Sequence, residues 1–427
     1  MKYISVITLT LLLFVSNIHA KSLTFDQVHL MPKSVEKDYF IWRFLCQGDC
    51  TASQAQQVIK EVNTLNTKLR TSYQEKTGKT AKAQPNVEKK IVTKEQRDAW
   101  LAKIASVKYF DDAIKKLQQG KKDLAITYFE KARLSAKGQY NIDRATFWLY
   151  KTTKKKIYLQ RLLKSWDVNL YTLLARDIMH IKYPRTITPK LSKKNLSHYN
   201  DQNPIHWTYI KKKLYKPSTN LTLLANKYKA EESVGVYTYI MSKASHQKNI
   251  YYPMPYRDIM SQLSKKRQAL IYAIARKESR FVPASVSRSF ALGMMQIMPF
   301  LIKHIAKERG EEIDLNEIFN PRKAIVYANH HINYLATYLH NPLFVAYGYN
   351  GGIGFTKRLI MRSDYFRNGP YEPYLSMEKI ENVEAREYGK KVMVNYVIYQ
   401  NKLGIPARIT PYVQVLTTPS ETDSFRK

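Results

Sequence analysis

One glutamate of this chain is a candidate for acid–base chemistry. Glu278 lies in the last turn of the segment QALIYAIARKESRF, in register with Ile271 and Ile274, so a single carboxyl group continues an apolar helical stripe. Burial in apolar surroundings disfavours the ionised form and raises the pKa of a carboxyl group, which a general acid working near neutral pH requires. The segment alone also suits a helix-end glutamate that pairs with Arg276 or Arg280.

A second segment, SRSFALGMMQIMPF, carries side chains that suit a ligand. Gly293 marks a small-residue turn, and Pro299 suits the first turn of a following helix. Gln296 is a donor and an acceptor that needs partners when buried, and a sugar hydroxyl or acetamido group would serve. Methionine is more commonly core filler, so Met298 also fits a purely structural role.

A third segment, FVAYGYNGGIGF, is expected to be a short apolar helix that ends at Tyr349 and Asn350. The two glycines that follow let backbone approach a ligand closely. Tyr349 offers a phenolic hydroxyl, and Asn350 a side chain that caps or braces the loop. Taken alone, YNGG is a common turn and a weak signal.

The elements that would position these residues are helices. The chain has 427 residues, of which 44% are hydrophobic and only 14 are glycine, with long Leu, Ile, Ala, Lys and Tyr runs and little strand-like alternation. We therefore predict an all-α fold in two to four domains, at roughly 100 to 200 residues each. The formal net charge of +36 favours polyanionic or anionic surfaces as partners.

The pattern of helices and breaks suggests how the chain is divided. FDDAIKKLQQGK and DLAITYFEKARL are adjacent amphipathic segments that can stack into a solenoid, and YYPMPYRD is a proline-punctuated connection. We expect a signal peptide at 1–20, a helical superhelical domain at 21–215, a helical linker domain at 216–255, a catalytic domain at 256–415 and a polar tail at 416–427.

The first twenty residues are typical of an exported protein. Lys2 precedes an apolar stretch and a small-residue end at Ala20, after which we expect cleavage. A membrane anchor would need a longer apolar run, of about 17 to 25 residues. We therefore predict a soluble exported protein without a transmembrane segment once the signal is removed.

Two cysteines and three histidines raise the question of a disulfide or a metal. Cys46 and Cys50 flank a Gly-Asp turn, a spacing that permits a disulfide in an oxidising compartment, although free thiols or metal ligands are alternatives. His330 and His331 point about 100° apart on a predicted helix that also holds His340, which favours surface or packing roles. We predict the disulfide, no metal and no cofactor.

The polar, basic run at 76–97 is expected to be a solvated loop. A nucleic-acid arm is disfavoured because the signal peptide removes the chain from the cytoplasm and no aromatic residue interleaves the lysines for base stacking. We predict no nucleic-acid partner.

The order ARKESRF, then GMMQIMP, then AYGYNGG resembles the signature of the soluble lytic murein transglycosylases. Upstream, ATFWLY, YTLLA and YYPMPYRD are similar to stretches of that family's helical ring and linker. The resemblance implies a ring-like N-terminal superhelix, a C-terminal lysozyme-like catalytic domain and the glycan strands and peptide stems of peptidoglycan as substrate. It also implies a periplasmic location, and we expect a monomer.

Carried over residue by residue, the resemblance implies that Glu278 is the catalytic acid/base. It further implies substrate contacts from Ser287, Gln296, Met298, Tyr349, Asn350 and Glu378. The sequence departs from the family's AYNAG pattern, so Tyr347 competes with Tyr349, and Glu384 competes with Glu378 in a divergent region.

Most glycosidases use two carboxylates, whereas the matching elements here offer only Glu278. The resemblance implies that the acetamido group of N-acetylmuramic acid takes the place of the second carboxylate by stabilising the positive charge at the anomeric carbon. It also implies that a 1,6-anhydro sugar end is formed. Two rival interpretations stay open: a hydrolytic muramidase of the same fold, and a scaffold without catalytic activity that binds the cell wall.

Overall fold

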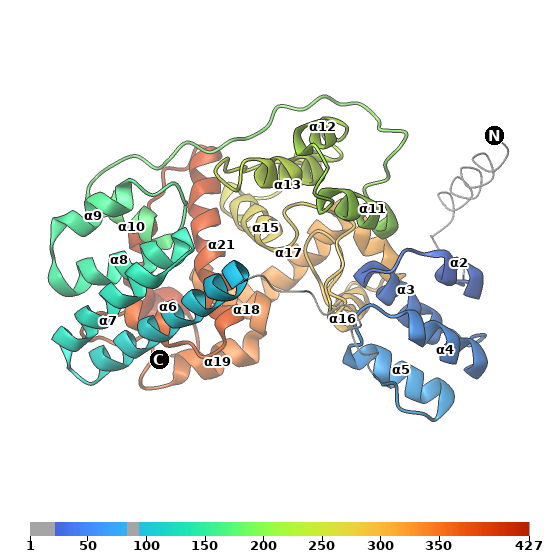
Figure 1. The fold of residues 1–427 in the computed structure, drawn as a ribbon, viewed down its shortest axis with the longest axis horizontal. Coiled ribbons are helices and arrows are strands. Elements are labelled where there is room, and N and C mark those ends of the chain that lie inside the picture. Colours follow the sequence, from blue (N-terminus) through green and yellow to red (C-terminus); the bar gives the residue numbers. More distant parts are fainter. Residues whose placement is uncertain (1–21, 83–93, 427) are drawn as a thin grey trace. The chain divides into compact units, whose positions relative to one another are not determined.

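The structure is a computed structural model that describes residues 22–82 and 94–426 (Figure 1). The predicted signal peptide and the middle of the basic run, 83–93, lie outside these residues. The described part of the chain consists of α-helices and short 3₁₀ helices, with isolated β-bridges and no strand. The predicted all-α fold is therefore confirmed. Within the described ranges, no helix combines the length and the apolar character that a membrane crossing demands.

The chain forms two compact units, each assembled from three stretches of sequence. The first unit comprises the described residues of 1–87 together with 189–244 and 278–330, and the second unit comprises those of 88–188, 245–277 and 331–427. The predicted superhelical and catalytic domains each contribute to both units, because packing joins helices that are distant in sequence.

The first unit contains short helices that begin at well-formed caps. Ser34 accepts a hydrogen bond from the Lys37 amide, and Asn66 accepts one from the Leu69 amide. Its elements are α2 (Phe25–Leu30), α3 (Val35–Leu45), α4 (Ala52–Val58), η1 (Ile59–Glu61), α5 (Thr67–Thr77), α11 (Pro204–Leu214), α12 (Leu221–Asn226), α13 (Val234–Ala244), α16 (Pro299–Glu308), η2 (Leu315–Phe319) and the first part of α17 (Pro321–Tyr338).

The second unit begins with consecutive helices that pack each on the next, as the amphipathic segments predict. Phe110, Phe129 and Trp148 come from three successive helices, and their ring centroids lie 5.3 and 5.6 Å apart. The first of these helices starts at Lys94, inside the run that was predicted to be a loop. These elements are α6 (Lys94–Gln118), α7 (Lys122–Ser135), α8 (Gln139–Thr153), α9 (Lys156–Leu163) and α10 (Leu170–Ile178).

The remaining helices of the second unit include α21, the long red helix of Figure 1, on which α18 and α22 pack. Helix α18 packs so closely on α21 that a Cβ on Gly389 would lie 2.3 Å from a ring carbon of Tyr347. The elements are α14 (Arg257–Met260), α15 (Lys265–Glu278) up to Lys277, the last part of α17, α18 (Pro342–Gly351), α19 (Ile353–Met361), α20 (Tyr374–Lys379), α21 (Val383–Lys402), α22 (Ile409–Gln414), η3 (Val415–Thr417) and α23 (Pro419–Thr422).

The predicted polar tail at 416–427 is folded in its described part. The side chains of Asp423 and Arg426 are buried and form an ion pair of 2.7 Å. Arg426 also donates hydrogen bonds to the carbonyl oxygens of Phe366 and Leu416. Because each charge has partners, polar residues can be buried here at low cost.

Cys46 and Cys50 are free thiols in the structure, which corrects the predicted disulfide. The sulfur of Cys46 lies 3.4 Å from the hydroxyl of Ser72, whereas that of Cys50 lies 3.7 Å from the carbonyl oxygen of Thr51. The two sulfurs therefore have different neighbours. Burial also raises the pKa of the Cys50 thiol, which disfavours the thiolate that disulfide formation needs.

Candidate functional site

Glu278 is the last residue of α15, and its side chain is half-buried. Ile274 and Ile271, one and two turns earlier, are buried, so the apolar stripe expected from the sequence exists. The helix ends because Arg280 and Phe281 adopt left-handed backbone conformations, with φ of 56° and 65°. The chain therefore turns sharply directly after the candidate acid.

Helix α13 holds the backbone of this turn. A Cβ on Gly235 would lie 2.0 Å from the carbonyl oxygen of Phe281, so only glycine allows the two segments to approach this closely. The next residues, Val282 and Ala284, are buried in a core formed mainly by α11, α12 and α13. The predicted linker helices thus position the segment that follows Glu278.

The loop from 279 to 298, here called the site loop, is ordered by its own hydrogen bonds. Ser279 donates its hydroxyl to the carbonyl oxygen of Met294 at 2.7 Å. Leu292 and Ile297 exchange two backbone hydrogen bonds of 3.0 Å. Gly293 has φ of 77° and lies against Ile318. The loop has a defined shape, and it carries Ser287, Gln296 and Met298 in the first unit.

The side-chain amide nitrogen of Gln296 is used to hold the site loop. Its Nε2 donates to the carbonyl oxygens of Ser285 and Gly293, at 3.1 and 2.8 Å. No hydrogen bond to its Oε1 is recorded within the described residues, so this oxygen can accept one from a ligand. Ser287 accepts a hydrogen bond from the Ala291 amide, so its hydroxyl proton can be donated to another group. Met298 is half-buried at the start of α16.

Aromatic residues of the N-terminal helices pack against the site loop. The buried ring of Phe290 stacks on Trp42 with centroids 5.5 Å apart, and Tyr39 lies edge-on to it at 6.0 Å. Asn66 and Lys68 donate hydrogen bonds to the carbonyl oxygens at 288 and 289, at 2.8 and 3.5 Å. The N-terminal helices are therefore a support for the site loop.

Two tyrosines of α18 in the second unit have very different surroundings. Tyr347 is fully buried, and its hydroxyl makes no hydrogen bond within the described chain. Burial raises its pKa well above the ordinary value. Tyr349 is half-buried and its ring lies 5.7 Å from that of His331, while the neighbouring Asn350 is also half-buried. Of the two tyrosines, Tyr349 is the one that a ligand can reach.

Glu378 lies in a buried cluster of charges, with 4% of its surface exposed. Arg144 donates two hydrogen bonds to its Oε2, at 2.9 and 2.6 Å, and Lys390 a third at 3.1 Å. Tyr171 donates to its Oε1 at 2.6 Å. Its acceptor sites are therefore occupied from inside the protein. Glu384, the competing carboxylate, is exposed in the first turn of α21.

The charges in this cluster determine the protonation of its acids. Burial alone would raise the pKa of Glu378, but Arg144 and Lys390 outweigh it and hold that pKa well below its usual range. For Glu387, burial is likewise outweighed by Lys390 and Arg144, and its pKa falls to about 2. Both acids are ionised at neutral pH, and we call this group the charge cluster.

The three histidines considered in the sequence have separate partners. His330 lies 2.8 Å from Glu308, and the ring of His331 stacks on Tyr334. His340 lies beyond the end of α17, with its Nε2 3.3 Å from the hydroxyl of Ser424. In the part of the chain that the structure describes, no three residues of the metal-binding types are grouped to hold an ion.

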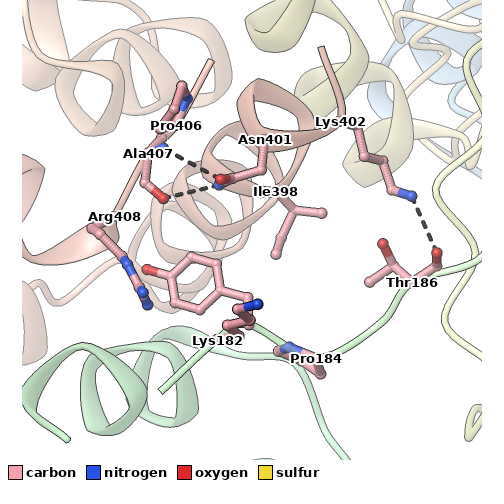
Figure 2. Close-up of a pocket in the computed structure, with 10 residues that line it drawn as sticks. Lys182, Pro184, Thr186, Ile398, Asn401, Lys402, Pro406, Ala407 and Arg408 are labelled. Carbon is pink, nitrogen blue, oxygen red and sulfur yellow. Dashed lines mark hydrogen bonds between the residues drawn. The ribbon is translucent and has the colours of Figure 1, made fainter. Parts of the chain in front are cut away.

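A pocket of about 500 Å³ lies elsewhere in the second unit (Figure 2). Its walls come from the loop after α10 and from the end of α21, and Lys402 reaches across to Thr186 and Thr188. Arg408 is held by Asp177 at 3.3 Å and by the carbonyl oxygen of Ile181. None of the candidate site residues lines this pocket.

Residues 258–368 match the family described as the transglycosylase SLT domain. The chain carries an SLT domain. The matched range includes Glu278, the site loop and the end of α18, so the resemblance inferred from these three segments is confirmed. Glu378 and Glu384 lie outside the matched range.

Sequence relatives support the SLT domain. The chain is 26% identical over 163 residues to the soluble lytic murein transglycosylase of Salmonella typhimurium, a match that covers 36% of this chain and 24% of that protein. The chain therefore matches about a quarter of the length of this curated relative.

Solved structures share the fold well beyond the SLT domain. The 70-kDa soluble lytic transglycosylase of Escherichia coli is 17% identical, with a TM-score of 0.50 over 93% of this chain and 67% of that one. A complex of the 70-kDa soluble lytic transglycosylase with bulgecin A is 18% identical, with a TM-score of 0.51 over 93% and 66%. At such identities the similarity concerns the all-α fold.

Two structural features were missed from the sequence. The packing of Trp42 on Phe290 joins residues 248 positions apart, and no local pattern indicates it. The charge cluster did leave a signal, because Arg144 directly precedes the apolar run ATFWLY and Lys390 lies two residues before the apolar run VMV of α21.

Proposed function

We propose that the chain is a lytic transglycosylase that cleaves the bond between N-acetylmuramic acid and N-acetylglucosamine in peptidoglycan. The observation that carries the proposal is the position of Glu278 inside the SLT domain, half-buried at the end of α15 and followed directly by the ordered site loop. A protonated Glu278 is the form that can act as a general acid.

In the proposed mechanism, Glu278 protonates the oxygen of the glycosidic bond as the bond to the anomeric carbon breaks. The acetamido group of the substrate supports the positive charge at that carbon. The Glu278 carboxylate then removes the proton of the 6-hydroxyl, whose oxygen closes the 1,6-anhydro ring. One acid is enough for both steps, and the sequence holds no Asp or Glu between Glu278 and Glu308.

The other candidates have roles that fit their geometry. The hydroxyl of Ser287 and the Oε1 atom of Gln296 would bind polar groups of the sugar, and Met298 would contact an apolar face. Tyr349 and Asn350 would contribute from α18. For the peptide stem, exposed Glu384 suits direct contact, whereas buried Glu378 would act by holding α8, α20 and α21 together.

The decisive experiment is digestion of purified sacculi by the wild type and by Glu278→Gln, followed by mass spectrometry of the products. We expect anhydromuropeptides from the wild type and a rate lower by roughly 10² to 10⁴ for the variant. Products heavier by one water would instead identify a hydrolytic muramidase. Equal clearing by both proteins would refute the role of Glu278, and binding without clearing by the wild type would support a scaffold.

Location and assembly complete the proposal. We propose that the chain is exported to the periplasm after cleavage behind Ala20 and that it acts as a monomer. The net charge of +36 would help it to remain on a wall rich in peptide carboxylates. That attraction should weaken with added salt, so binding to sacculi that is unchanged by ionic strength would contradict it.

A further inference from the structure

Five aromatic side chains of the second unit form a continuous series that we call the aromatic row. It begins at Tyr349, whose ring lies 5.7 Å from that of His331. His331 in turn stacks on Tyr334 at 6.2 Å, and Tyr334 meets Tyr338 at 5.8 Å. The row ends at Phe425, which is nearly parallel to Tyr338, with centroids 5.4 Å apart and planes 4° from each other.

The middle of the row is open to solvent. Tyr334 is 47% exposed and Tyr338 is 37% exposed, and they lie four residues apart on α17, so they share one side of the helix. Large aromatic rings contribute most to binding when they are covered, and their exposure in a row is typical of a surface that meets a partner.

The C-terminal segment holds the far end of the row in a fixed position. The Ser424 amide donates to the carbonyl oxygen of Tyr338 at 2.9 Å, and the His340 amide donates to that of Thr422 at 2.9 Å. The buried ion pair of Asp423 with Arg426 closes the turn around Phe425. The C-terminal segment thus fixes the ring of Phe425 beside α17, and the ring does not depend on a flexible tail.

A charge lies next to this end. The ammonium group of Lys357, on α19, is 5.1 Å from the centroid of the Phe425 ring. A cation that lies over an aromatic ring, next to exposed tyrosines, suits a ligand that combines an apolar face with carboxylate groups.

We propose that the aromatic row is a platform on which pyranose rings of an N-acetylated glycan strand stack, extending the contact beyond Tyr349. A β-linked N-acetylhexosamine presents axial C–H bonds on its ring faces, and these match the negative face of a tyrosine or phenylalanine ring. Lys357 would then meet carboxylates carried by the strand. The inference rests on the proposed function, because it is the continuity with Tyr349 that selects a glycan as the occupant.

The test uses the full chain carrying Glu278→Gln, so that the ligand is bound and not cleaved. The probes are the β-1,4-linked hexamer and dimer of N-acetylglucosamine, measured by calorimetry. We expect Tyr338→Ala to weaken hexamer binding roughly tenfold, which corresponds to ~1.4 kcal/mol, and to leave dimer binding unchanged. Tyr338→Phe, which keeps the ring, should bind both probes as the parent does.

Two further variants keep the result interpretable. Phe425→Leu retains apolar bulk without a ring and should also weaken the hexamer alone. Tyr209→Ala removes a tyrosine of similar exposure, 38%, from α11 of the first unit and should change neither probe. Thermal unfolding of each variant checks that the fold is intact.

Hexamer binding that is equal in the parent, Tyr338→Ala and Phe425→Leu would overturn the platform. Loss of a protein partner from these variants, with glycan binding unchanged, would assign the row to protein recognition and also overturn it. Failure of the proposed function has a different outcome, namely that the wild type releases no anhydromuropeptides from sacculi while hexamer binding still depends on Tyr338.

Discussion

The site loop of the first unit and the charge cluster of the second are positioned by different forces. The site loop depends on shape: left-handed residues, backbone hydrogen bonds and the packing of Phe290 on Trp42. The charge cluster depends on opposite charges that compensate one another out of water, with Glu378 between Arg144 and Lys390. The stability of the site loop should therefore be sensitive to added atoms, and that of the charge cluster to lost or neutralised charges.

The largest effect should follow from removing one charge of the cluster. Arg144→Met leaves the buried carboxylates of Glu378 and Glu387 to share Lys390, so we expect unfolding in urea to show a loss of about 3 to 5 kcal/mol. Arg133→Met is the matched control, because Arg133 pairs with Glu130 at a more exposed site of α7. The control should lose less than about 1 kcal/mol. Equal losses in the two variants would show that the cluster adds no stability of its own.

A single methyl group should disturb the site loop. Gly293→Ala places a Cβ 2.5 Å from the carbonyl oxygen of Ile318 at φ of 77°, so we expect a cost of roughly 2 to 4 kcal/mol and a slower enzyme. Gly354→Ala, inside α19, meets only the end of Arg358 at 3.4 Å and should be neutral or slightly stabilising. A Gly293→Ala protein as stable as the wild type would contradict the role of shape.

Acid should weaken the second unit through the charge cluster. The pKa of Glu387 is lowered to about 2 from an ordinary value of 4.5, so its ionised form is favoured by folding. Its contribution is complete above pH 4.5 and is lost as the pH falls towards 2. We expect Glu387→Gln to be less stable than the wild type at pH 7 and to lose less stability over this range. Parallel unfolding curves from pH 7 to pH 2 would exclude this contribution.

The smallest effect on stability should come from Tyr347→Phe. The variant removes a buried hydroxyl without a hydrogen-bond partner in the described structure, so the free energy of unfolding should stay within about 0.5 kcal/mol or rise. Activity on sacculi should be kept. Tyr349→Phe should be equally stable yet less active, and the reverse pattern of activities would assign the functional role to Tyr347.

Local chemistry allowed much of the helical framework to be predicted. Asn320 and Pro321 begin α17, and such a start can be inferred from sequence because a cap and a fixed φ act within a few residues. The segments around Glu278 and Tyr349 were found because their order along the chain matches a known domain.

What the sequence could not give were interactions between distant segments. No residue next to Phe290 in the sequence indicates that Trp42 packs on it. Asp423 and Arg426 are polar and therefore suggested an exposed tail, whereas the structure shows that they pair with each other in the interior. The burial of Glu378 met the same difficulty, since its partner Arg144 lies 234 residues away in the sequence.

The three-stretch make-up of each unit bears on how the chain matures. The first unit needs residues up to 330, and the second unit draws its last stretch from residues beyond 331. A growing chain that stops at residue 300 would lack η2 and α17, leaving Gly293 of the site loop without Ile318, against which it lies. We expect such truncated chains to aggregate or be degraded, because neither unit can complete its fold until residues of the second half of the chain have been synthesised.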